Sequence, residues 1–276
     1  MSRSHSPSSD PIPPANVSSA PPPWRLRTKL YVFATPLKPV NREDPILQGL
    51  PPGSYNPSET LHPSALAPVN GSPQWEGGLM TAVLVRYEDS PVGPYDELIM
   101  VVNGFANPHA KGTTGRITNI YVSTRQSVWN GRINWNIQKH LARFEFTPTG
   151  PMSSIFKAFL PDGEIPFFAA RVTDSHIPGI PIPSLFMNPF MRIVQPPLLA
   201  GLPADIQVES HDESWLSITP LYRGKWRLAY IQPVEGGPES FGDGLQFPKF
   251  KPFWIGVKFT GEILFPDGKK VTRKAE

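Results

Sequence analysis

The chain has 276 residues, 39% of them hydrophobic and 11% aromatic, which is enough for one large domain with a real core; charged residues make up only 18%, too few for a charge-rich disordered chain. The net charge of +3 is scattered apart from a basic tail at residues 269–274, which disfavours nucleic-acid binding. Cysteine is absent, which excludes disulfides, thiolate catalysis and cysteine-bound zinc. The 36 prolines argue against long helices and favour short strands joined by turns.

The N-terminal residues 1–22 are mostly Ser, Pro, Ala and Asn, and we expect them to form a disordered leader before a single domain at 23–276. This leader has no apolar core of the signal-peptide type, and no later segment is apolar for long enough to span a membrane. We therefore expect a soluble, cytoplasmic protein.

Alternating and β-branched segments predict mainly strands in the rest of the chain. The first is Trp24–Phe33, and it is followed by irregular chain over 36–75 with a short helix near Glu59–Leu66. The later strands are expected at Leu79–Tyr87, Glu97–Asn103, Ile117–Ser123, Arg143–Thr147, Ser154–Leu160, Phe167–Thr173, Ile206–Glu209, Trp215–Ile218, Trp226–Ile231, Trp254–Phe259 and Glu262–Phe265.

Three further segments complete this prediction. Thr124–Arg132 is expected to be a short helix or turn, and Thr260-Gly261 is expected to separate the last two strands. The apolar, proline-rich segment Pro178–Pro203 is either a packed loop or a lid. The whole pattern predicts one barrel-like β domain with a minor helical part.

Common catalytic motifs are missing. The sequence has no glycine-rich phosphate loop, no GxSxG elbow and no HExxH pair, and its six histidines are not at metal-ligand spacing. We therefore expect neither a metal nor an organic cofactor.

Two segments carry a specific resemblance. Residues 85–97 are VRYEDSPVGPYDE, and residues 127–142 are SVWNGRINWNIQKHLA. Together they resemble the acetoacetate decarboxylase superfamily, which shows a strand, a Gly-Pro/Cys-Tyr-x-Glu turn, and a Gly-Arg-Glu stretch running into Pro-Lys-Lys. The details look closer to fungal members of that superfamily. The resemblance is specific over residues 79–147, loose over 24–33 and poor after 175.

The resemblance implies a fold, an activity and site residues. The fold would be α+β but mainly β, with a closed antiparallel barrel or cone-like sheet around an apolar cavity and a few short helices. Lys139 takes the place of the imine-forming lysine, Glu97 that of the glutamate that orients substrate and handles protons, and Arg132 that of the arginine in Gly-Arg-Glu. An imine turns a carbonyl into an electron sink, and the amine must be neutral to form it.

The chain also departs from the family pattern. His140 replaces the second lysine and is expected to modulate the pKa of the first, while Gln138 and Ile133 replace the proline and the glutamate of the motif. A second active-site glutamate aligns with Ala82, and a substrate-binding arginine aligns with Lys29. These changes leave acetoacetate itself in doubt as the substrate.

The leading hypothesis is a carbon–carbon lyase of the decarboxylase type, or an aldol or dehydration enzyme, acting on a keto acid or a polyketide-like carbonyl compound in fungal secondary metabolism. Lys139, Glu97 and His140 would be catalytic, and Tyr95, Arg132, Lys29 and Trp135 would bind substrate. One alternative is a non-catalytic protein that binds a small molecule on the same scaffold. Another is an imine-independent cyclase or dehydratase that uses Glu97 and His140 as acid and base. The resemblance also makes a homo-oligomer one option.

Overall fold

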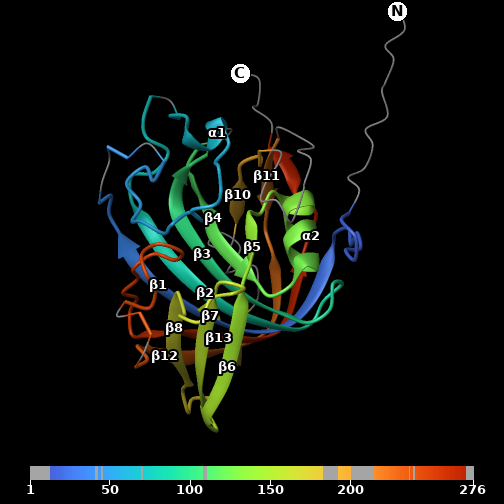
Figure 1. Ribbon diagram of the computed structural model, residues 1–276, viewed down its shortest axis with the longest axis vertical. Helices are drawn as coiled ribbons and strands as arrows, with labels where there is room; N and C mark the ends of the chain where they lie inside the picture. The colour runs from blue at the N-terminus through green and yellow to red at the C-terminus, as the bar shows by residue number, and fades with distance from the viewer. Residues whose placement is uncertain are drawn as a thin grey trace, which may run out of the picture.

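The computed structural model describes residues 13–40, 43–44, 46–69, 71–107, 111–182, 192–199, 214–235, 237–238 and 240–271. Two short helices accompany a 14-stranded sheet (Figure 1). The helices are α1 (Pro63–Leu66) and α2 (Arg125–Trp135). The strands are β1 (Trp24–Leu37), β2 (Gly78–Asp89), β3 (Tyr95–Ala106), β4 (Thr113–Val122), β5 (Lys139–Leu141), β6 (Arg143–Gly150), β7 (Ser153–Phe159), β8 (Phe168–Asp174), β9 (Ile180–Pro181), β10 (Ile193–Gln195), β11 (Trp215–Ile218), β12 (Leu221–Gln232), β13 (Ile255–Phe265) and β14 (Lys269–Val271).

The sheet is not closed into a barrel, so the predicted closed antiparallel sheet is wrong in this respect. Its order is β14-β11-β10-β4-β3-β2-β1-β13-β12-β8-β7-β6, with β14 and β6 at unpaired ends among the described strands. The far edge of β4 is divided between two short strands, β5 and β10, and both pair with it in parallel. Strand β5 is only three residues long, and the chain continues from it into the β6–β7 hairpin, so among the described strands β6 and β14 stay unpaired with each other.

Strict alternation gives the central strands two different faces. In β1, the buried Trp24, Leu26 and Leu30 alternate with the exposed Arg25 and Arg27. In β2 and β3 both faces are covered, so one set of side chains lines a cavity and the other set enters a separate core. A shift of one residue in register would exchange the two sets.

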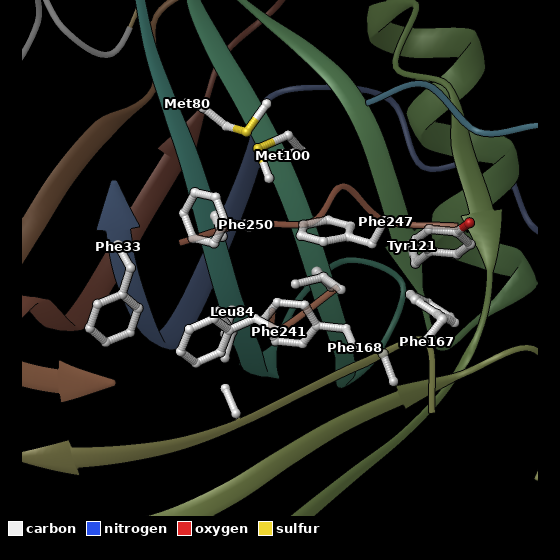
Figure 2. Close-up of a cluster of buried hydrophobic side chains, with 14 of the residues drawn as sticks. Phe33, Met80, Leu84, Met100, Tyr121, Phe167, Phe168, Phe241, Phe247 and Phe250 are labelled. Atoms are coloured by element: carbon white, nitrogen blue, oxygen red, sulfur yellow. The ribbon is translucent and has the colours of Figure 1, made fainter. Parts of the chain in front are cut away.

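The separate core is rich in phenylalanine and lies on the side of β2 and β3 away from the cavity (Figure 2). Its largest side chains come from distant parts of the chain, and several of their rings pack edge to face. The residues labelled in Figure 2 are Phe33, Met80, Leu84, Met100, Tyr121, Phe167, Phe168, Phe241, Phe247 and Phe250.

Helix α2 has defined caps at both ends. The Thr124 side chain accepts a hydrogen bond from the Ser127 backbone N–H, which is a typical N-cap. The helix ends at Asn136, which adopts a left-handed conformation with φ 55° and donates its N–H to the carbonyl of Arg132. The chain therefore reverses within two residues and enters β5.

The strand predictions are confirmed for most segments, with one clear correction. Trp254–Phe259 and Glu262–Phe265 are parts of a single strand, β13, and Thr260-Gly261 lies inside it. Gly261 is required because the backbone of the neighbouring strand β12 lies very close to it, and no turn is present. A Cβ at Gly261 would lie 2.3 Å from the Arg223 carbonyl oxygen and 2.6 Å from the Gly224 Cα.

Two predictions fall wholly or partly outside the described residues. Ile206–Glu209 lies outside them entirely. Of the 178–203 segment, only residues 178–182 and 192–199 are described, and they contribute β9 and β10. The choice between a packed loop and a lid therefore stays a prediction.

Ordered contacts begin earlier than the expected end of the leader at residue 22. Residues 16–20 lie along α2, where Asn130 accepts from the Ala20 N–H at 2.7 Å and donates to the Ser18 carbonyl at 2.9 Å. Gln126 and Asn134, which lie one helical turn to either side, bind the same segment. We call residues 16–20 the N-terminal strap.

The described part of the chain contains no helix with the length and apolar character that a membrane-spanning helix needs.

Candidate functional site

A cavity of about 250 Å³ lies on the face of the sheet opposite the phenylalanine-rich core. Its walls are apolar and include Leu30, Val83 and Ile99 from the three central strands. Among the described residues that line it, Glu97 is the only acidic side chain and Lys139 the only basic one. An apolar pocket with a few converging polar groups is the usual form of a small-molecule site.

Helix α2 and its cap place Lys139 in this cavity. After Asn136, the Ile137 N–H bonds back to the Gly131 carbonyl, and β5 then pairs Lys139 with Ile120 of β4. Gly131 leaves room for the lysine stem, because a Cβ there would lie 2.6 Å from the Lys139 Cδ. The lysine is only 5% exposed.

The amine of Lys139 is held by two oxygens. Its Nζ donates to Glu97 Oε2 at 2.8 Å and to Ser127 Oγ at 3.0 Å. The other carboxylate oxygen of Glu97 accepts from the Tyr87 hydroxyl at 3.2 Å, and the Tyr95 ring lies 5.3 Å from Nζ. A buried amine, a carboxylate and hydroxyls in contact form a set that can move protons at a carbonyl group.

The tyrosines around Glu97 are held in their neutral form. Burial, followed by the negative charge of Glu97, raises the pKa of Tyr87 and Tyr95 well above the ordinary value. The same two causes raise the pKa of Tyr222, which also lines the cavity, to about 12. These hydroxyls therefore remain protonated at neutral pH.

His140 and Arg132 belong to a different cluster. His140 follows Lys139 in the strand, so its side chain points to the opposite face, where its Nε2 lies 2.8 Å from Glu59 Oε2. Arg132 donates to the same carboxylate at 2.6 Å and to the Lys139 carbonyl at 3.0 Å. Neither residue is among those that line the cavity.

Glu59 is the acid of this second cluster, and the sequence analysis did not single it out. Burial raises its pKa, but the hydrogen bond with His140 and the charge of Arg132 outweigh burial and hold the pKa below its usual value. The Glu59 carboxylate is therefore ionised at neutral pH, and through Arg132 the cluster anchors the backbone of β5 next to the lysine.

The remaining residues considered in the sequence analysis lie in three places: the cavity, the surface and the phenylalanine-rich core. Tyr95 and Trp135 both line the cavity, and the Trp135 indole N–H donates to the Pro266 carbonyl at 2.8 Å. Lys29 lies at the surface, with its amine 2.6 Å from Glu88. Ala82, which aligned with a family glutamate, packs in the phenylalanine-rich core.

The sequence analysis missed three residues, namely the cavity-lining Tyr87 and Tyr222, and Ser127, which contacts the Lys139 amine. A signal existed for two of them. Ser127 lies one helical turn before Gly131 on the same face of α2. Tyr87 pairs with Tyr95 across the β2–β3 hairpin, which places it diagonal to Glu97 on the same face. Tyr222 comes from a distant strand, and no local pattern marks it.

Comparisons with known proteins support the fold. No protein-family model matches the chain, and no curated protein matches it. Among solved structures, acetoacetate decarboxylase from Legionella pneumophila superposes with a TM-score of 0.55 at 16% identity, covering 92% of this chain and 89% of that one. A second acetoacetate decarboxylase structure gives 0.57 at 8% identity over 94% and 93% of the two chains.

A third structure similar to this chain is the enduracididine biosynthesis enzyme MppR complexed with pyruvate, with a TM-score of 0.53 at 12% identity over 95% of each chain. At these identities the likeness shows the fold alone. This chain therefore has the mainly β fold of acetoacetate decarboxylase and MppR. The closeness to fungal members and a role in secondary metabolism stay predictions, as does a cytoplasmic location.

Proposed function

We propose that the chain is an acetoacetate decarboxylase-like enzyme that forms an imine between Lys139 and a carbonyl compound bound in the cavity. One observation carries the proposal: the Lys139 amine contacts Glu97 and Ser127 and lines a cavity whose other walls are mostly apolar. The fold shared with acetoacetate decarboxylase supports the same reading of the lysine.

The geometry supports a division of labour between the contacting groups. Glu97 takes a proton from the Lys139 ammonium, and the neutral amine then adds to the carbonyl carbon. Glu97 gives this proton to the carbonyl oxygen, takes a second proton from the adduct nitrogen and gives it to the new hydroxyl, which departs as water and leaves the iminium. Ser127 fixes the direction of the amine before attack. The iminium draws electrons from an adjacent carbon–carbon or carbon–hydrogen bond.

Reductive trapping tests this proposal. The protein is incubated with a panel of ketones, aldehydes, and 2- and 3-keto acids, reduced with borohydride, and mapped by mass spectrometry. We expect an adduct on Lys139 and none in a Lys139→Met variant. Lys29→Met is the matched control, because Lys29 is the other lysine nominated by the sequence and it lies at the surface. A folded protein that gives no adduct with any compound would overturn the imine.

A binding protein without chemistry is the second candidate, and the apolar lining favours it. It predicts that a ligand is recovered unchanged and that Lys139→Met still binds it. The imine-independent cyclase has less support. It needs Glu97 and His140 to act on one substrate, whereas the His140 side chain contacts Glu59 outside the cavity lining.

A further inference from the structure

The charge balance of the cavity limits what can bind there. Lys139 and Glu97 are the charged groups among its described lining residues, and they neutralise each other at 2.8 Å. Both are nearly buried, with side chains 6% and 3% exposed. No lining cation within the described part of the chain is left to hold an anionic group of a ligand.

The cationic side chains closest to this question, Lys29, Arg132 and Arg116, bind partners outside the cavity lining. Lys29 is bound to Glu88 at the surface, and Arg132 is bound to Glu59. Arg116 lies on β4 and is buried, but its guanidinium contacts the Gln74 side chain, the Ala65 carbonyl and the Phe105 ring, none of which lines the cavity. Among the described lining residues, a substrate carboxylate would therefore meet no arginine and no second lysine.

A carboxylate in this cavity would also be disfavoured directly. It would lose its hydration against walls of Leu, Val, Ile and Trp, and it would lie near the like charge of Glu97. An uncharged carbonyl compound meets neither penalty. Its oxygen needs no cationic partner, and its hydrocarbon chain can pack against the apolar walls.

We propose that the substrate is an uncharged ketone or aldehyde with a hydrocarbon chain, and that the step after imine formation is loss of an α-proton instead of loss of carbon dioxide. This inference rests on the proposed function. The α-carbon–hydrogen bond breaks, its electron pair moves into the iminium to give an enamine, and Glu97 takes the proton. The enamine carbon then regains a proton or bonds to a second carbonyl carbon, as in an aldol addition.

The test compares compounds that differ in charge. Borohydride trapping uses 2-octanone and octanal against freshly prepared 3-oxooctanoate and 7-oxooctanoate. We expect half-maximal labelling of Lys139 by the neutral compounds at about tenfold lower concentration, because the acids pay for desolvation and repulsion. In deuterated water, we expect the protein to exchange the α-protons of 2-octanone, and Glu97→Gln to slow this exchange. Equal or stronger labelling by the acids, or no exchange, would overturn the inference.

A gain-of-function variant tests the same cause. Thr81 lines the cavity from β2, so Thr81→Lys adds the missing cation. We expect it to shift the preference toward the acids by about tenfold, and Thr149→Lys, at an exposed position of β6, to leave the preference unchanged. An unchanged preference in a folded Thr81→Lys protein counts against the charge argument.

Binding separates failure of this inference from failure of the proposed function. Trp24, Trp135 and Trp226 line the cavity, so their fluorescence reports occupancy without chemistry. Labelling by acids alone would refute the neutral substrate and keep the imine. Fluorescence binding of 2-octanone without labelling would refute the imine and keep a neutral ligand. Neither binding nor labelling would refute both.

Discussion

Gly131 decides where the Lys139 amine lies. A Cβ at this position would come within 2.7 Å of the Lys139 Cε, and the flexible lysine stem is the part that must move. We expect Gly131→Ala to slow borohydride labelling by about tenfold or more, since misplacing a reacting group by about 1 Å is costly. The free energy of unfolding should change by no more than about 1 kcal/mol, because alanine is the better helix former.

The matched control is Gly150→Ala, where an added Cβ would meet nothing within 4 Å. This control should label at the rate of the unmodified protein. If both variants label equally fast, the amine is not confined by α2 and the packing argument is wrong.

Glu59 binds the buried Arg132 guanidinium and the buried His140 imidazole, and its loss should be strongly destabilising. Glu59→Gln leaves Arg132 buried without a charged partner, and we expect the free energy of unfolding to fall by about 3 kcal/mol at neutral pH. Glu88→Gln breaks a surface pair with Lys29 and should cost less than about 1 kcal/mol. Urea unfolding of the three proteins measures both values.

The pH dependence of the same variant has a definite sign. The pKa of Glu59 is lowered in the folded protein, so its contribution is present above the unfolded value of about 4.3 and is lost as pH falls through the lower folded value. The difference between the parent and Glu59→Gln should therefore shrink in acid. A difference that is constant down to the acid transition would contradict the assignment.

The site residues differ in how far the sequence could predict them. Lys139 and Glu97 were found together because each follows a short motif whose neighbours fix its position. The orientation of His140 follows from alternation, since neighbours in a strand point to opposite faces. The sequence placed His140 beside Lys139 in the site because the segment resembles a pair of adjacent lysines, and a role for His140 in catalysis stays a prediction. Glu59 could not be found, since it comes from an irregular segment whose position depends on tertiary packing.

At the scale of elements, the N-terminal strap is the contact that the sequence predicted least well. A Pro- and Ser-rich composition suggested disorder, yet the side chains of α2 satisfy the backbone of residues 16–20. Composition indicates only how much apolar surface a segment can bury by itself. The hydrogen-bond partners of this segment lie on a helix more than a hundred residues away in the sequence, so composition could not indicate them.

The strap should stabilise α2 and thereby the site. Asn130 is fully buried and binds the strap through both ends of its amide, so we expect Asn130→Ala to lower the free energy of unfolding by about 2 kcal/mol. The measurement is a double-mutant cycle in which the second change is deletion of residues 1–20. In the shortened chain the same substitution should cost much less. An equal cost in both chains would mean that Asn130 acts only within the helix.

Strand positions were predicted better than strand pairing. Trp215–Ile218 matches β11, and Ser154–Leu160 with Phe167–Thr173 gave the β7–β8 hairpin to within one residue at each end. Local alternation and turn residues contain this information. The parallel pairing of β5 and β10 with β4 is non-local, and nothing in either short segment indicates it.

For the whole molecule, the buried tyrosines predict sensitivity to alkali. Burial and Glu97 raise the pKa of Tyr87 and Tyr95 well above the usual value, and that of Tyr222 to about 12, whereas an unfolded tyrosine ionises near pH 10. Stability from these groups is therefore full below about pH 10 and is lost as pH rises through the folded values.

Guanidinium unfolding followed by tryptophan fluorescence should show this loss between about pH 10 and 12. Tyr222→Phe should flatten the decline, because its ring stays but its hydroxyl cannot ionise. A Tyr222→Phe protein whose stability falls as steeply with rising pH as that of the parent would contradict the assignment.

The two faces of β2 and β3 also bear on how such a protein can change over generations. In both strands the odd-numbered residues line the chamber around Lys139, and the even-numbered residues between them pack in the phenylalanine-rich core. Mutation can therefore explore new chamber shapes at every second position while the scaffold is inherited unaltered. A directed-evolution library restricted to positions 81, 83, 99 and 101 should yield many folded members with altered ligand preference, whereas one restricted to 82, 84, 98 and 100 should yield mostly misfolded chains.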